Sequence, residues 1–256
     1  MARVVVITGA SGGIGAELAR QLGQRGEQLV LAARREAELG QSARAASPTA
    51  VPVVADATRR PDVEKIREAA LKAFGHVDVW VNNAGRGITR RVMDLTDDDL
   101  DQMMAVNVKS ALYGIQAIVP HFLERRAGHL INVSSMLGRV PFVPARSAYG
   151  AAKSFLNALT ANLRAELRAT CPAIQVSLVM PGAVRTDFAK NALGGTPPYP
   201  PGGNYQTQSA EEVAALLVNL IEHPVAELYT QPSGPEMVRS YYQDVVAFEA
   251  TRAARS

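Results

Sequence analysis

Cysteine is almost missing from this chain of 256 residues, which contains only Cys171. A single thiol excludes an intrachain disulfide and any metal site built from several cysteines, and it fits a reducing compartment. Histidine is also scarce, and the four histidines, at positions 76, 121, 129 and 223, lack the spacing of metal ligands. We therefore expect no metal site.

Long apolar runs and charged runs are missing as well. No apolar segment approaches the ~18 residues needed to span a bilayer. The first residues pass from Met-Ala-Arg directly into Val4-Val-Val-Ile7, which is too short for the apolar region of a signal peptide. The net charge of +3 is spread along the chain and forms no basic patch. These absences predict a cytoplasmic protein that binds neither nucleic acid nor a membrane.

The sequence instead alternates regularly between two kinds of segment. Apolar runs typical of buried parallel strands occur at 4–8, 28–33, 51–56, 77–82, 129–134, 175–180 and, more weakly, 227–231. Segments with helical periodicity occupy about 13–24, 36–46, 61–74, 97–126, 149–169 and 209–222. We predict a single α/β domain over 1–256, with a Rossmann-type, doubly wound parallel sheet of about seven strands and helices on both faces.

Two segments depart from this alternation. Glycine and proline cluster between 192 and 208, shortly after the sixth predicted strand. Ligands bind at that edge of such sheets, so we predict a substrate lid over about 186–208, with an idle loop as the alternative. Residues 235–254 predict an additional C-terminal helix with Met237, Tyr241, Val245 and Phe248 on one stripe. Such a stripe more often packs within the molecule than against a partner.

A glycine-rich turn follows the first predicted strand. It reads Thr8-Gly-Ala-Ser-Gly-Gly-Ile-Gly15 and continues into a helix, the arrangement in which a dinucleotide pyrophosphate sits at a helix N-terminus. The second strand ends in Leu31-Ala-Ala-Arg34-Arg35, without a carboxylate for a ribose 2′-hydroxyl. Two guanidiniums suit a 2′-phosphate and favour NADP(H) over NAD(H). The alternative is a pair of exposed arginines, although cations are unfavourable at the positive end of a helix.

Tyr149 and Lys153 are four positions apart in a segment with helical periodicity, so they lie on one face of the helix. An ammonium beside a phenol favours the phenolate, so we expect the pKa of the tyrosine to fall from its unperturbed ~10 towards neutrality. That would make the tyrosine a usable proton donor and acceptor. Taken alone, the same spacing more often marks an amphipathic tyrosine and a solvated lysine.

Six motifs occur in one order: Thr8 to Gly15, Asn82-Asn-Ala-Gly85, Asn107, Ser134-Ser135, Tyr149-x-x-x-Lys153 and Pro181-Gly182. Together, over residues 4 to about 188, they resemble the short-chain dehydrogenase/reductase family. The resemblance implies a catalytic tetrad of Asn107, Ser135, Tyr149 and Lys153, in which Asn107 holds a water that passes protons to the lysine. It implies cofactor contacts from Gly9, Ser11, Gly13, Ile14, Gly15, Arg34, Arg35, Asp56, Ala57, Asn83, Ala84, Gly85, Tyr149, Lys153, Pro181, Gly182, Val184 and Thr186. Asn82 has a structural alternative, because its amide can tie neighbouring strands together.

The serine position has two alternatives. The resemblance selects Ser135, but Ser135 and Tyr149 are fourteen positions apart, apparently one more than is common in the family. We place the extra residue in the loop 139–146, and Ser134 stays an alternative for the residue that faces the substrate. Further residues expected to face the substrate are Met136, Leu137, Arg146, Phe188 and the 192–208 loop.

The resemblance implies an enzyme that transfers a hydride between NADP(H) and the carbonyl or secondary alcohol of a small, hydrophobic or amphipathic substrate. It implies a homodimer paired through the helices at 108–126 and 149–169, with a homotetramer as the alternative. A non-catalytic NADP(H)-binding regulatory protein is a second hypothesis. A third is an epimerase or dehydratase of the extended branch, against which the short substrate segment and the glycine spacing argue.

Overall fold

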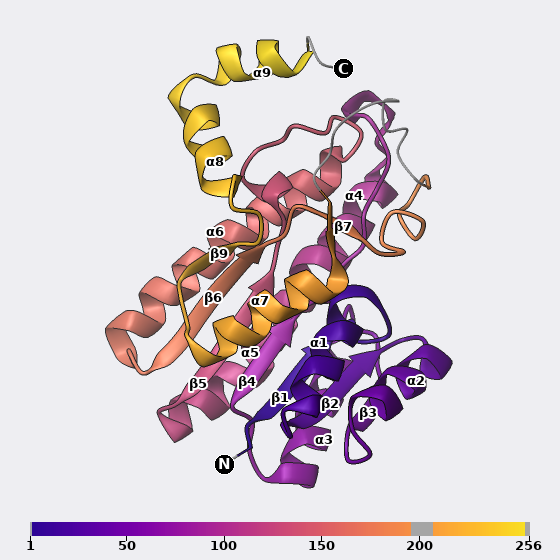
Figure 1. Ribbon diagram of the computed structural model, residues 1–256, viewed down its shortest axis with the longest axis vertical. Helices are drawn as coiled ribbons and strands as arrows, with labels where there is room; N and C mark the ends of the chain where they lie inside the picture. Colours follow the sequence, from indigo (N-terminus) through magenta and orange to yellow (C-terminus); the bar gives the residue numbers. More distant parts are fainter. Residues whose placement is uncertain (1, 196–206, 254–256) are drawn as a thin grey trace.

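Seven parallel strands form the centre of the protein (Figure 1). The computed structural model describes residues 2–195 and 207–253. The strands lie in the order β3-β2-β1-β4-β5-β6-β9. Their bounds are β1 Val4–Thr8, β2 Gln28–Ala33, β3 Val51–Val54, β4 Val79–Asn82, β5 Gly128–Val133, β6 Ile174–Met180 and β9 Glu227–Tyr229. This order confirms the predicted doubly wound α/β fold.

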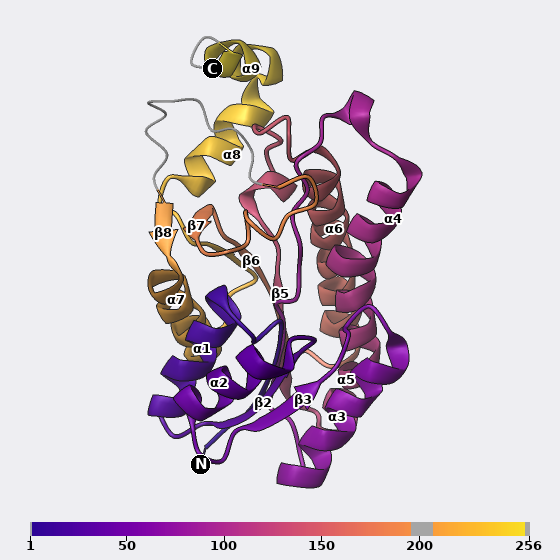
Figure 2. The same ribbon diagram turned by 90° about the vertical axis from the view of Figure 1, so that its right-hand side faces the viewer.

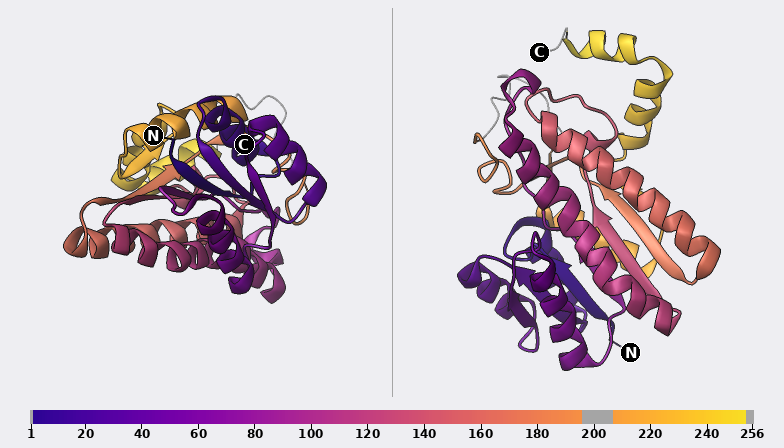
Figure 3. Two further views of the ribbon diagram at one scale, coloured as in Figure 1. Left: turned by 90° about the horizontal axis from the view of Figure 1, so that it is seen from below. Right: turned by 180° about the vertical axis from the view of Figure 1, so that it is seen from behind.

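Helices cover both faces of the sheet (Figures 2 and 3). One apolar cluster joins the sheet to α1 Gly13–Gln24, α2 Glu36–Ala46 and α7 Ala210–Glu222. A second cluster on the other face includes α3 Arg60–Phe74, α5 Ser110–Arg125 and α6 Ser147–Thr170. Among the residues that the structure describes, no helix is both long and apolar enough to cross a bilayer.

Strand β1 shows why the strand sequences are almost continuously apolar. Val5 and Ile7 belong to the first cluster, whereas Val4 and Val6 belong to the second. Successive side chains of a strand point to opposite faces, and both faces are covered here. Full burial of one such side chain contributes about 1.5–3 kcal/mol to the free energy of folding.

Asn82 is a structural residue within the sheet. Its amide donates to Asn132 Oδ1 at 2.9 Å and its Oδ1 accepts from Trp80 Nε1 at 2.8 Å. Asn132 in turn donates to Thr160 Oγ1 of α6 at 2.9 Å. These buried bonds tie β4, β5 and α6 together, in agreement with the structural alternative for Asn82.

The predicted helix over 97–126 has three parts. Helix α4 Asp97–Met104 begins with a capping box between Thr96 and Asp99, and α7 begins with another between Ser209 and Glu212. A π-helical turn, Ala105–Lys109, then separates α4 from α5. Turns of this kind are frequent at functional sites.

The prediction of one C-terminal helix is wrong, because the segment forms α8 Gly234–Gln243 and α9 Val245–Ala253. Asp244 has an extended backbone, and its side chain accepts from Ala247 N at 2.9 Å. An aspartate of this kind ends one helix and caps the next. Met237 packs against the body, and Tyr241 contacts Phe248 with 5.4 Å between ring centroids. Part of the predicted apolar stripe therefore packs against itself, and α9 turns away from the sheet (Figure 1).

The lid predicted over about 186–208 lies partly outside the described residues, at 196–206. On either side of that stretch, β7 Ala183–Arg185 pairs with β8 Thr207–Ser209 in a small parallel sheet. Leu193 exchanges backbone hydrogen bonds with Gly87 and Thr89. The described part of the segment is therefore anchored to the loop that follows β4.

His129 is a buried histidine at the start of β5. Ser177 Oγ donates to Val225 O at 2.6 Å, so the hydroxyl oxygen accepts from His129 Nε2 at 2.8 Å. The other ring nitrogen, Nδ1, is buried without a hydrogen-bond partner among the described residues. Burial, with a smaller effect from the charge of Arg3, lowers the pKa of His129 to about 4.

We expect this histidine to make the protein less stable in acid. The unfolded chain, with a histidine pKa of about 6.5, binds more protons than the folded chain between pH 6.5 and pH 4. Stability therefore falls as the pH is lowered through that window, by up to about 3 kcal/mol for the full shift. His129→Gln should flatten this part of the stability profile, measured by urea unfolding at fixed protein concentration, whereas the exposed His223→Gln should not. An unchanged slope in His129→Gln would contradict the assignment.

Candidate active site

The strand order reverses between β1 and β4, and the chain joins these two strands tightly at their carboxyl ends. Thr8 Oγ1 accepts hydrogen bonds from the backbone N–H groups of Asn83 and Ala84, both at 3.1 Å. The Asn83 amide donates to the carbonyl oxygens of Thr8, at 3.0 Å, and Gly9, at 3.2 Å. Ligands of doubly wound folds bind in the crevice at such a reversal.

The glycine turn between β1 and α1 has no room for side chains at two positions. Gly9 has φ 69°, and a Cβ there would lie 2.9 Å from Ala84 Cα. At Gly15 a Cβ would lie 2.6 Å from both Asn83 Nδ2 and the Gly9 carbonyl oxygen. Helix α1 begins after Gly12, and none of the side chains that the structure describes caps it. Its N-terminal N–H groups are therefore suited to an anion such as a pyrophosphate.

Two arginines, Arg34 and Arg35, lie at the end of the crevice next to the glycine turn. The Arg35 guanidinium donates to the Ser11 hydroxyl at 3.0 Å and the Ser11 carbonyl at 3.1 Å. It also lies 3.3 Å from Glu38. Arg34 lies 3.9 Å from Asp56, whose carboxylate accepts from the Thr58 N–H at 2.9 Å. Arg35 therefore reaches over the glycine turn, and Arg34 faces Asp56, two residues after the end of β3.

A continuous cleft of about 1180 Å³ connects this region with Tyr149. It is lined by every predicted cofactor residue except Gly15, which packs beneath the turn. Ser135 and the predicted substrate-facing residues Met136, Leu137, Arg146 and Phe188 also line it, as do Ala192 and Thr207 from the predicted loop. The cleft also contains Arg86, Phe142 and Val143, which the motifs did not predict. Arg86 directly follows the Asn82 to Gly85 motif, which is the signal that could have identified it.

The two serines after β5 point in different directions. The Ser134 hydroxyl donates to Asn157 Oδ1 at 2.5 Å, so it faces α6. The Ser135 hydroxyl accepts from the Leu137 N–H at 3.1 Å and interacts with the Tyr149 phenol. The structure therefore places Ser135, and not Ser134, beside the tyrosine.

The expectation that the pKa of Tyr149 falls towards neutrality is wrong. Burial raises the pKa of Tyr149 to about 12, and the Ser135 hydrogen bond and the charge of Arg146 only partly oppose this rise. The Lys153 ammonium lies 5.8 Å from the centre of the tyrosine ring and donates to the Val133 carbonyl at 2.9 Å. Desolvation therefore outweighs the nearby positive charges.

Lys153 is itself buried, with 3% of its surface exposed. Burial lowers the pKa of Lys153 to about 7, because no carboxylate is paired with it among the described residues. An amine with this pKa changes its charge near neutral pH. Lys153 can therefore take or release a proton under ordinary conditions.

Asn107 lies in the π-helical turn, behind the cleft rather than in its wall. Its amide donates to the Arg86 carbonyl at 3.0 Å, and its Oδ1 accepts from the Arg86 N–H at 3.2 Å. A Cβ added to Gly85 would lie 3.1 Å from Asn107 Oδ1 and 3.5 Å from Lys153 Nζ. Asn107 and Lys153 thus approach the same glycine from behind the cleft.

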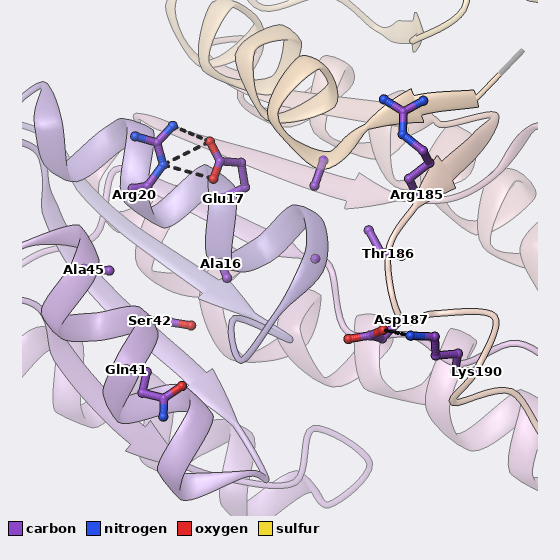
Figure 4. Close-up of a pocket in the computed structure, with 12 residues that line it drawn as sticks. Ala16, Glu17, Arg20, Gln41, Ser42, Ala45, Arg185, Thr186, Asp187 and Lys190 are labelled. Atoms are coloured by element: carbon purple, nitrogen blue, oxygen red, sulfur yellow. Dashed lines mark hydrogen bonds and ion pairs between the residues drawn. The ribbon is translucent and has the colours of Figure 1, made fainter.

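A second hollow, of about 760 Å³, lies on the other side of the glycine turn (Figure 4). Five residues line both hollows: Gly13, Arg185, Thr186, Asp187 and Lys190. The second hollow contains the ion pairs Glu17–Arg20, at 2.6 Å, and Asp187–Lys190, at 3.1 Å. Within the described ranges, no group of three or more histidine, cysteine, aspartate or glutamate side chains could hold a metal ion.

Comparison with known proteins places these features in a family. A family model described as short chain dehydrogenase matches residues 3–195. An uncharacterized oxidoreductase of Staphylococcus epidermidis is 36% identical over 188 residues, which cover 73% of this chain and 80% of the relative.

Two solved structures extend the comparison to bound cofactors. A short-chain dehydrogenase/reductase from Burkholderia phymatum, in complex with NAD, has a TM-score of 0.85 and 27% identity, and the match covers 96% of this chain and 95% of that one. An alcohol dehydrogenase from the archaeon Thermococcus sibiricus, complexed with 5-hydroxy-NADP, has a TM-score of 0.77 and 28% identity, and the match covers 90% and 96%. Similar proteins thus hold either form of the cofactor.

Proposed function

The chain belongs to the short-chain dehydrogenase/reductase family, and on that basis we propose that this oxidoreductase is an NADP(H)-dependent carbonyl reductase or secondary-alcohol dehydrogenase. The observation that carries the proposal is the position of Ser135, Tyr149 and Lys153 along one cleft that begins at the glycine turn. Proton donors beside a dinucleotide site are what reversible carbonyl reduction requires. No feature of the described residues favours the non-catalytic alternative.

The glycine turn and the N-terminus of α1 fit a pyrophosphate, and the wall formed by Pro181, Gly182, Val184 and Thr186 leads from there towards Tyr149. When bound, the nicotinamide cofactor supplies the hydride in reduction and accepts it in oxidation. In the proposed reaction Ser135 donates a hydrogen bond to the substrate oxygen, and Tyr149 gives that oxygen its proton. Lys153 then returns a proton towards the tyrosine.

The protonation states of Tyr149 and Lys153 suit the reducing direction. With a pKa raised to about 12, Tyr149 is a neutral phenol at pH 7 and has a proton to donate. With its pKa lowered to about 7, Lys153 is partly protonated at the same pH. We place Asn107 behind Lys153 as the holder of a relay water, as the resemblance implies.

The substrate half of the cleft is largely apolar. Met136, Leu137, Phe142, Val143 and Phe188 line it. The Phe188 ring meets the Tyr149 ring edge to face, with 5.5 Å between their centroids. This lining supports a small hydrophobic or amphipathic ketone or alcohol as substrate, although pockets for small molecules are commonly apolar.

The preference for NADP(H) rests on the position of Arg35. Its guanidinium lies over Ser11, beside the turn, and no carboxylate stands at the end of β2 to bind a ribose 2′-hydroxyl. The Arg35–Glu38 ion pair is half-exposed, so solvent screens it and an incoming phosphate can replace Glu38 at little expense. Arg34, whose side chain is 63% exposed, can add a second positive charge.

Replacing the proton donor tests the reaction. We expect Tyr149→Phe to lower kcat by about 100-fold to 10,000-fold, because it removes the general acid and keeps the ring. NADPH should still bind. The measurements are stoichiometric NADPH oxidation with a panel of ketones, aldehydes and quinones, and NADPH binding by fluorescence titration. Near-normal turnover by Tyr149→Phe would refute the role.

The adjacent serines provide the matched control for this test. Ser135→Ala should lower kcat by about 100-fold, since it removes a donor to the developing oxyanion. Ser134→Ala should keep most of the turnover and lose about 1–3 kcal/mol of stability, because the buried Asn157 oxygen loses its donor. The opposite pattern would assign the substrate-facing role to Ser134.

A separate prediction concerns cofactor choice. The wild-type protein should bind NADPH more tightly than NADH, and Arg35→Ala should weaken NADPH binding by about 10-fold to 100-fold, the value of a charge-assisted hydrogen bond. NADH binding should change far less. Arg44→Ala, an exposed arginine of α2 away from the cleft, is the control. Equal affinities for NADH and NADPH in the wild-type protein would overturn the preference.

We also propose that the protein is a homodimer paired through α5 and α6. Phe155 on α6 and Leu123 on α5 are apolar side chains that are 52% and 40% exposed. Light scattering should give about twice the chain mass of 27.3 kDa, and Phe155→Glu should lower it. A wild-type mass equal to one chain would exclude the dimer, and a fourfold mass would indicate the tetramer.

A further inference from the structure

Arg146 is the one buried arginine in the wall of the cleft among the described residues. Only 6% of its surface is exposed, whereas Arg34 and Arg35 at the other end have half or more of their side chains in solvent. It precedes α6, three positions before Tyr149. Arginine stays charged in proteins, so this position holds a permanent positive charge away from water.

No carboxylate of the described residues forms an ion pair with Arg146. Three acidic residues line the cleft, and each is paired elsewhere: Glu38 with Arg35, Asp56 with Arg34, and Asp187 with Lys190 (Figure 4). Residues 196–206, which are not described, contain no aspartate or glutamate. A buried charge without a counter-ion is strongly unfavourable, so the position is suited to an anion that arrives with a ligand.

The contacts of Arg146 leave most of its donors for such a ligand. One guanidinium nitrogen, Nη1, donates to the Ile88 carbonyl at 3.2 Å. Among the described residues this is the one hydrogen bond that the guanidinium donates, and a guanidinium has five N–H donors. The guanidinium carbon lies 6.0 Å from the centre of the Phe188 ring, and the same ring contacts Tyr149. The charge therefore lies close to the reacting tyrosine, and its field acts on the pKa of Tyr149.

The rest of this half of the cleft decides what kind of anion fits. Apolar side chains such as Met136 and Phe188 line this half of the cleft. Two other basic residues there already donate to backbone carbonyls, Arg86 to Asn191 at 2.9 Å and Lys153 to Val133 at 2.9 Å. A doubly charged phosphate would have a single buried guanidinium to compensate it. A singly charged, planar carboxylate matches one guanidinium fork.

We propose that Arg146 binds a carboxylate of the substrate, so that the enzyme reduces oxo acids, or oxidises hydroxy acids, with an apolar chain. The proposal rests on the proposed function, and it makes the amphipathic substrate more specific. The carboxylate meets Arg146, the carbonyl lies between Ser135 and Tyr149, and the chain follows Met136 and Phe188. The reaction is the balanced one already described, in which the carbonyl gains a hydride and a proton, and the carboxylate takes no part in bond changes.

The test compares charged and neutral substrates of the same shape. A series of 3-oxo acids of four to eight carbons is assayed with NADPH beside the methyl esters of the same acids. The wild-type protein should favour the acids by about 10-fold or more in kcat/KM, as expected for a charge-assisted bidentate contact. In Arg146→Gln, which removes the charge and keeps a donor for the Ile88 carbonyl, that ratio should fall at least about 10-fold. Arg146→Lys should retain part of the preference.

A binding measurement makes the result independent of turnover. Saturated carboxylates of the same lengths, and their amides, are tested as ligands of the NADPH complex by thermal shift. The carboxylates should raise Tm in the wild-type protein and much less in Arg146→Gln, and the amides should bind weakly to both. Arg91→Gln, an exposed arginine outside the cleft, is the matched control and should behave as the wild-type protein. Circular dichroism and NADPH binding verify that each variant is folded.

The outcomes separate the two proposals. Esters reduced as well as acids, or an equal loss of both in Arg146→Gln, would overturn the carboxylate site and leave the carbonyl reductase standing. Carboxylates that bind only when Arg146 is present, without reduction of any carbonyl, would support the site and count against the reaction. If no acid binds and no acid is reduced, the carboxylate site is refuted.

Discussion

The hydrogen bonds between Thr8 and the chain after β4 are the constraint on which the site depends. Strands β1 and β4 are neighbours in the sheet, but the chain leaves them in opposite directions, and this opens a crevice. At the base of that crevice, Thr8 Oγ1 accepts from the Asn83 N–H and the Asn83 amide donates to the Thr8 carbonyl. These bonds hold the loops after β1 and β4 together. Because the two loops are held together, Gly9 lies close to Ala84 and Gly15 lies close to Asn83. The glycines are thus required by packing between two loops as well as by the turn itself.

Burial governs the electrostatics of the reacting centre. Tyr149 and Lys153 on α6 are buried. Desolvation favours the neutral form of each side chain. It raises the pKa of the phenol to about 12 and lowers the pKa of the amine to about 7. The site therefore holds a proton donor beside a group that titrates near neutrality. A bound ligand changes this balance through the charge it brings and the water it displaces.

The arginines of the cleft differ in environment more than in chemistry. Arg34 and Arg35 keep contact with solvent and with partly exposed carboxylates, so they can exchange partners at little energetic expense. Arg146 lies within the apolar half, with one hydrogen bond to a carbonyl oxygen. Two positively charged regions therefore stand at opposite ends of one cleft, with the proposed acid/base group between them. A cofactor phosphate at one end and a substrate carboxylate at the other would hold the reacting carbon between them.

Local sequence patterns predicted the sheet and the helices on both faces, because buried parallel strands and glycine turns leave strong patterns over a few positions. The resemblance of the motifs to a known family predicted many of the residues that line the cleft. Only the tertiary structure showed that Ser134 faces α6 while Ser135 faces Tyr149, since the two are neighbours and the choice depends on how the chain leaves β5. The π-helical turn at Asn107 and the division of the C-terminal segment at Asp244 depend on packing and on one side-chain cap. The sequence also could not predict that the pKa of Tyr149 rises or that Arg146 lacks an ion-pair partner among the described residues. Burial and the position of every nearby charge decide both, and these exist only once distant segments meet.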